Sequence, residues 1–139
     1  MVAAVCSWHE SHEAATTELD GRFARGDALI VAAPALVESY AVLTRLPPPH
    51  RLSPVDAITL LDSNFLTGSI LTALDVKAYT TLLRKASDKG IAGGRVYDWV
   101  IVACAVKANA SVVITFNAKD FISLLPEQME IMVPGGDSR

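Results

Sequence analysis

Apolar and polar positions alternate along this chain in two patterns, which predict helices and short strands in turn. Amphipathic spacing over His9–Arg25 indicates a helix, and the continuous apolar run Ala28–Val31 is typical of a buried parallel strand. The same alternation predicts helices from Pro34 to about Leu46, Ser53 to about Asn64, Asp75 to Asp88 and around Asp98 to near Asn109, with strands at Ser69–Thr72, Ser111–Thr115 and Met129–Val133. Helices that alternate with short apolar strands favour an α/β fold with a parallel sheet.

Local residue chemistry supports several of these helix ends. Pro34 fits the first turn of a helix, and the prolines that begin at Pro47 end it, because proline has no N–H to donate. Ser53 followed by Pro54 is a typical helix start, with the serine as N-cap.

Composition sets the class of protein. A chain of 139 residues that is 51% hydrophobic predicts a folded domain, which we place at residues 1–134 with a flexible tail at 135–139. No apolar run is long enough to cross a membrane, and the first residues lack the basic start of a signal peptide. Cys6 and Cys104 are far apart in the sequence, which favours reduced thiols and a cytoplasmic location.

Two isolated acids are the most informative candidates for chemistry. Asp98 is the only charged residue in Val96–Val106, and Glu38 is the only one from Ala28 to Thr44. A carboxylate in an apolar segment is costly unless it is paired, hydrogen-bonded or bound to a cation. Carboxylate oxygens are the ligands that Mg²⁺ or Mn²⁺ prefers, so a shared metal-binding cleft is one interpretation.

More polar side chains follow the clearest strand. Thr115, Asn117 and Asp120 come directly after the apolar residues 112–114, at the carboxyl end of a strand where functional groups gather in parallel sheets. Asp98 lies near the start of its helix, where the helix dipole favours an anion. We expect these elements and the helix of Glu38 to face one cleft.

The net charge of −3 argues against a strongly basic nucleic-acid coat but leaves a local basic patch open. The candidates for such a patch are Arg45, His50, Arg51, Arg95 and Lys119. Solvated side chains with no ligand are the alternative.

Three blocks of sequence resemble a known family. Pro34–Pro47, Gly94–Asp98 and Ile114–Phe121 look like the motifs of PIN-domain proteins, and within that superfamily the chain resembles VapC-type toxins of bacterial toxin–antitoxin pairs. The resemblance implies a three-layer sandwich, with a short parallel sheet flanked by helices. It also implies an Mg²⁺- or Mn²⁺-dependent endoribonuclease with an RNA substrate, a small antitoxin partner and a homodimer.

The resemblance also suggests a role for each candidate. Glu38 and Asp98 match the second and third acids of the family, and Asn117 stands where many members carry a fourth acid. Asp120 is an alternative fourth ligand, and Thr115 would orient a carboxylate or a water. Basic residues would hold the RNA, namely Arg45, Arg51, Arg95 and Lys119.

This chain differs from the PIN-domain pattern at the first motif. PIN domains begin with a strand that ends in Asp-Thr or Asp-Ser, whereas no acid precedes Glu10 here, and Met1–Cys6 looks like the helix that follows that strand. We therefore expect the first strand to be missing. A catalytically impaired module that binds RNA or a partner protein is the alternative function.

Structural roles compete with the functional interpretation at several positions. Glu38 has Arg45 as a candidate structural partner, and Asp98 has Arg95. His9 and His12 share a helix face, but their spacing is not that of a helical zinc motif, so solvated residues are favoured. A last apolar group is expected to pack in the core or to dock an antitoxin helix, namely Leu60, Leu61, Phe65 and Leu66.

Overall fold

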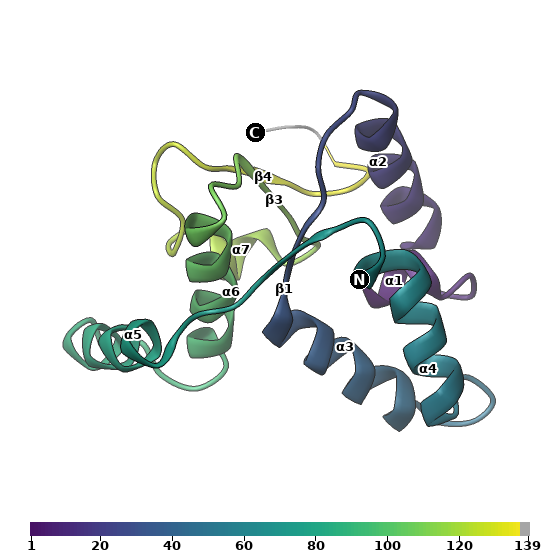
Figure 1. The fold of residues 1–139 in the computed structure, drawn as a ribbon, viewed down its shortest axis with the longest axis horizontal. Helices are drawn as coiled ribbons and strands as arrows, with labels where there is room; N and C mark the ends of the chain where they lie inside the picture. The colour runs from purple at the N-terminus through teal and green to yellow at the C-terminus, as the bar shows by residue number, and fades with distance from the viewer. Residues whose placement is uncertain (137–139) are drawn as a thin grey trace. The chain divides into compact units, whose positions relative to one another are not determined.

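The computed structural model describes residues 1–136, along which helices and short strands alternate as the sequence predicts (Figure 1). Contacts within the chain divide it into two units, unit 1 from Met1 to Leu71 and unit 2 from Thr72 onward. The prediction of an α/β fold is confirmed. The prediction of one domain over residues 1–134 stays a prediction, and residues 137–139 of the expected tail lie outside the described residues.

Unit 1 is mainly helical, with a short two-stranded sheet. The first residues are helical, as the resemblance implied, and Ser53 caps a later helix as predicted. Its elements in chain order are α1 (Val2–Val5), α2 (His12–Ala24), β1 (Ile30–Ala32), α3 (Ala33–Arg45), α4 (Pro54–Leu61), the π-helix η1 (Asp62–Leu66) and β2 (Ile70–Thr72), which pairs with β1.

Three predicted elements of unit 1 have different bounds in the structure. The helix predicted from His9 begins at His12, and the strand predicted at Ala28–Val31 covers Ile30–Ala32. The helix expected to run from Ser53 to about Asn64 is α-helical only to Leu61, and then widens into the π-turn η1. Its defining bond runs from the Thr67 N–H to the Asp62 carbonyl, at 3.0 Å. The wider turn places Phe65 in the core, where it is 4% exposed.

The core of unit 1 is formed by α1, β1, α3, α4 and η1. Leu43 of α3 and Leu61 of α4 are fully buried, and Val31 of β1 and Phe65 pack with them. Pro34 lies in the first turn of α3, as predicted. Leu61 and Phe65 are therefore core residues, and Leu60 and Leu66 beside them are half-buried, which supports core packing over antitoxin docking.

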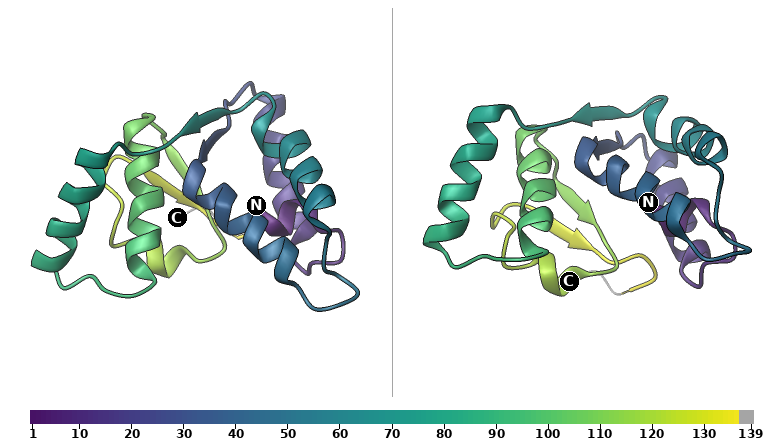
Figure 2. Two further views of the ribbon diagram at one scale, coloured as in Figure 1. Left: turned by 60° about the horizontal axis from the view of Figure 1, so that its bottom comes forward. Right: turned by 90° about the horizontal axis from the view of Figure 1, so that it is seen from below.

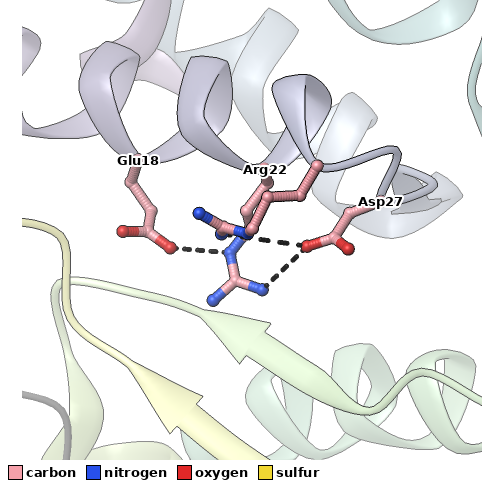
Figure 3. Close-up of polar contacts among 4 residues, drawn as sticks. Glu18, Arg22 and Asp27 are labelled. Carbon is pink, nitrogen blue, oxygen red and sulfur yellow. Dashed lines mark hydrogen bonds and ion pairs between the residues drawn. The ribbon is translucent and has the colours of Figure 1, made fainter.

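A small ion-pair network lies at the C-terminal end of α2 (Figure 3). The Arg22 Nε lies 2.6 Å from Glu18 one turn earlier, and its Nη1 lies 3.4 Å from Asp27 beyond the helix. The Asp27 N–H also donates to the Arg22 carbonyl at 3.1 Å. These bonds fix the turn that leads from α2 to β1.

Unit 2 combines two long helices with a parallel strand pair (Figure 2). Val113 of the first strand is aligned with Ile131 of the second, so the predicted parallel pairing is confirmed. Its elements are α5 (Val76–Asp88), α6 (Arg95–Lys107), β3 (Val112–Ile114), α7 (Ala118–Phe121) and β4 (Glu130–Met132).

The core of unit 2 lies between α6, α7 and the two strands. Val102 of α6 packs with Val113 of β3, Phe121 of α7 and Met129 just before β4. On its other side α6 contacts α5. Through residue 136, the structure contains no helix that combines the length and apolar character required to span a bilayer.

The N-cap of α4 provides a first stability test. The Ser53 Oγ accepts the Asp56 N–H at 3.1 Å and donates to the Asp56 carboxylate at 2.6 Å. Ser53→Ala removes both bonds, so we expect the free energy of unfolding to fall by about 1 kcal/mol. Urea denaturation measures this change.

Ser63→Ala is the matched control for Ser53→Ala. The Ser63 Oγ, in η1, bonds back to the Thr59 carbonyl of α4 at 2.9 Å. We expect this variant to stay within about 0.5 kcal/mol of the wild type. Equal losses in the two variants would contradict the capping role of Ser53.

Candidate functional site

Asp98 is half-buried in the first turn of α6. At this position the partial positive charge of the helix N-terminus stabilises a carboxylate. The Arg95 Nη2 in the same turn donates to the Ser123 Oγ beyond α7, at 2.8 Å. This bond joins the start of α6 to the segment after α7, and α6 and α7 are in contact.

The turn between β3 and α7 gathers three of the predicted side chains. The Thr115 Oγ1 accepts the Asn117 N–H at 3.0 Å, and the Asn117 side-chain amide donates to the Asp120 carboxylate. The Thr115 N–H in turn donates to the Met132 carbonyl at 3.0 Å, which holds the turn against the end of β4. The structure therefore joins Asn117 and Asp120, which the sequence left as alternative ligands.

The chemistry of this turn suits a hard cation. Because the Asn117 amide nitrogen is bonded to Asp120, its carbonyl oxygen is the atom left to meet a ligand. Carboxylate, amide and hydroxyl oxygens are the donors that Mg²⁺ and Mn²⁺ prefer. The Thr115 hydroxyl binds the backbone N–H of Asn117, and its predicted role of orienting a carboxylate or a water stays a prediction.

Glu38 lies on the exposed side of α3, in unit 1. Burial lowers the pKa of the Met1 amino group, and electrostatic interactions with Cys6 and Glu38 partly oppose that shift. The Glu38 carboxylate therefore acts electrostatically on the start of α1. No ion pair joins Glu38 to Arg45 within residues 1–136.

The predicted basic residues differ in what they contact. Arg51 bonds through Nε to the Leu46 carbonyl at 2.8 Å, and His50 stacks on Trp8 with ring centroids 4.1 Å apart. Arg45 at the end of α3 and Lys119 in α7 are exposed. Arg51 thus supports the loop after α3, whereas Arg95 supports the contact with Ser123.

The paired histidines have structural contacts instead of a metal geometry. The His12 Nδ1 lies 2.9 Å from the Ala3 carbonyl, and the His9 Nδ1 accepts the Ser11 N–H at 3.1 Å. Within either unit, the described residues include no cluster of three His, Cys, Asp or Glu side chains that could hold a metal ion. The hydrogen bonds of His9 and His12 argue against the zinc alternative.

The two cysteines are buried free thiols, as predicted. Burial raises the pKa of Cys6 and of Cys104, so both favour the neutral thiol at neutral pH. Neither has the lowered pKa of a nucleophilic cysteine.

Ser123 makes a polar contact in this region that the sequence did not point to. It lies 28 residues from its partner Arg95, in a turn without any motif. A serine in a turn is an ordinary feature, so only the fold identifies this contact.

Comparison with known proteins identifies the family. The family described as PIN domain matches residues 1–124. Ribonuclease VapC40 of Mycobacterium tuberculosis is 42% identical over 110 residues, which is 79% of this chain and 76% of the relative. Ribonuclease VapC27 of Mycobacterium tuberculosis strain ATCC 25618 / H37Rv is 37% identical over 76 residues, 55% of this chain and 53% of the relative. No solved structure matches the chain. The chain therefore belongs to the PIN-domain family, and within it to the VapC-type proteins.

Proposed function

We propose that this chain is a Mg²⁺- or Mn²⁺-dependent endoribonuclease, the toxin of a type II toxin–antitoxin system. The observation that carries the proposal is its 42% identity, over 79% of its length, to a relative named as a ribonuclease. The oxygen donors around the turn after β3 add chemical support.

In this proposal Glu38, Asp98 and Asn117 hold the cation, with Asp120 beside Asn117. A divalent cation bound there would activate water and stabilise the charge that develops on the scissile phosphate. Thr115 positions Asn117, and the helix dipole of α6 favours the ionised form of Asp98. Arg45, Arg51, Arg95 and Lys119 would bind the phosphates of the RNA.

The partners are proposed from the same relationship. A small antitoxin protein would inhibit the enzyme, and a second copy of the chain would form a homodimer. The cytoplasm is the proposed location, where the two buried thiols would remain reduced.

Removing divalent metal is the direct test of this function. We expect the wild-type chain to cleave a structured RNA in Mg²⁺, and to lose that cleavage completely in excess EDTA, because the charge on the phosphate is then no longer neutralised. Denaturing gel electrophoresis of the RNA measures the products. Adding Mg²⁺ or Mn²⁺ in excess of the chelator should restore them.

EDTA saturated beforehand with Mg²⁺ is the control for the chelator itself, and it should leave cleavage unchanged. Cleavage that persists in metal-free EDTA would contradict the proposed mechanism. RNA binding without any metal-dependent cleavage would support the impaired module in place of the enzyme.

A further inference from the structure

Helix α5 leaves one long face without a protein neighbour in the described part of unit 2. Asp75 caps it by accepting the Ala78 N–H at 2.7 Å, and Leu82 and Ala86 are buried on the side that contacts α6. Figure 2 shows α5 at the edge of unit 2, with α6 running beside it. The opposite side of α5 is exposed from its first turn to its last.

This exposed face of α5 is basic. Lys77, Arg84 and Lys85 are all exposed, and Thr80 and Thr81 lie between them. The spacing from residue 77 to residues 84 and 85 is about two helical turns, roughly 10–12 Å along the axis. We call these five residues the α5 basic face.

The nearby lysines that are not part of this face are already engaged. Lys89 lies over the Trp99 ring, 5.7 Å from its centroid, and the Lys107 Nζ donates to the Ala73 carbonyl at 2.7 Å. By contrast, the three cations of the α5 basic face form no ion pair with a carboxylate within residues 1–136. Their charges are therefore available to a ligand.

Two features of local electrostatics oppose this placement, although Lys85 in the last turn of α5 is favoured by the helix dipole. Lys77 lies in the first turn of α5, where the helix dipole disfavours a cation. Lys85 and Lys89 are four residues apart, a spacing at which like charges repel. Asp88, four residues after Arg84 and three after Lys85, is the only acid within α5, so one carboxylate on this face stands against three cations.

A bound polyanion would offset the unfavourable position of Lys77 and the repulsion between Lys85 and Lys89. Residues 1–71 contain eight acids and four Lys or Arg residues, whereas residues 72–139 contain seven acids and eight Lys or Arg residues. Basic charge is thus concentrated in the half of the chain that contains α5. Lysine and arginine bind phosphate, and threonine hydroxyls donate to phosphate oxygens.

We infer that the α5 basic face binds the phosphate backbone of RNA, as a substrate-binding surface additional to the basic residues predicted from the sequence. The inference rests on the proposed function, since RNA is the polyanion on which the enzyme would act. Contacts to phosphates carry no sequence information, so this surface would position RNA without selecting its sequence.

Two triple variants test the surface. The first is Lys77→Gln, Arg84→Gln and Lys85→Gln, which removes charge but keeps good helix formers. The second is Lys77→Arg, Arg84→Lys and Lys85→Arg, which keeps the charge at the same positions. Fluorescence anisotropy of a labelled single-stranded RNA of mixed sequence, in EDTA, gives the Kd at several salt concentrations.

We expect the glutamine variant to bind RNA roughly 10- to 100-fold more weakly near 0.1 M salt, with a salt slope shallower by about 2, because each single-strand phosphate contact contributes about 0.7 to the slope. The charge-preserving variant should bind as the wild type does. Asp88→Asn should tighten binding, because it removes the acid next to the basic face.

The outcomes separate this inference from the proposed enzyme. A glutamine variant with the wild-type Kd and salt slope overturns the inference, and leaves Mg²⁺-dependent cleavage standing as a separate result. If the wild-type chain binds RNA through the α5 basic face but does not cleave it, the inference is supported and the proposed enzymatic function is overturned. A wild-type chain that does not bind this RNA in EDTA overturns the inference, and the cleavage assay in Mg²⁺ then decides the proposed enzyme separately. Circular dichroism should confirm equal helix content in the two triple variants.

Discussion

Asp98→Asn is expected to lower kcat for Mg²⁺-dependent RNA cleavage by roughly a thousandfold, with the protein still folded. The substitution keeps the size of the half-buried side chain but removes the negative charge in the first turn of α6. Neutralisation of transition-state charge by a metal contributes several kcal/mol, and about 4 kcal/mol corresponds to a thousandfold in rate. Initial rates of cleavage at saturating RNA measure the change.

Glu127→Gln is the matched control for Asp98→Asn. Glu127 is an exposed acid of the same unit, so its loss changes the net charge equally without altering the proposed site. We expect wild-type kcat and wild-type Mg²⁺ dependence. Wild-type activity in Asp98→Asn would reject the assignment of Asp98.

Glu38→Gln tests whether a second acid, from α3 of unit 1, acts on the same cation. If both acids hold one metal, the double variant should be only slightly less active than the less active of the two single variants. Residues that act as a unit have strongly non-additive effects. Losses that multiply would indicate that Glu38 and Asp98 act independently.

Local chemistry explains why most elements were predictable from the sequence. Pro34, Ser53 and Asp75 each fix a helix start through bonds within the same turn or through a constrained backbone, and the structure begins α3, α4 and α5 at these positions. The π-turn after Leu61 was not predictable in this way. It depends on the burial of Phe65 in the core of unit 1, which apolar periodicity alone does not reveal.

The candidate site shows the same division between local and long-range information. Thr115, Asn117 and Asp120 were found because polar residues directly follow a strand, and the hydrogen bonds that join these three residues to one another span at most three positions. The bond from Arg95 to Ser123 was missed, because it joins segments 28 residues apart. The α5 basic face was missed because apolar spacing predicts the buried side of a helix but does not show whether another element covers its polar side.

Leu43→Ala is expected to cause a large loss of stability in unit 1. The Leu43 side chain is fully buried on α3, where it packs with Val31, Ala57, Leu61 and Phe65. Truncation loses the transfer free energy of the leucine and leaves a cavity, so we expect the free energy of unfolding to fall by about 3–5 kcal/mol. Much of the usual stability of a small domain would then be lost.

Tryptophan fluorescence in urea measures this effect in unit 1 alone. The chain has two tryptophans, and Trp99 is in unit 2, so a Trp99→Phe background leaves Trp8, stacked on His50, as the reporter of unit 1. Val37→Ala on the same helix is the control, because that side chain is 71% exposed, and we expect a change within about 0.5 kcal/mol. A Leu43→Ala loss as small as that of the control would mean that α3 is not held by the core described above, and the position of Glu38 on α3 would lose its structural basis.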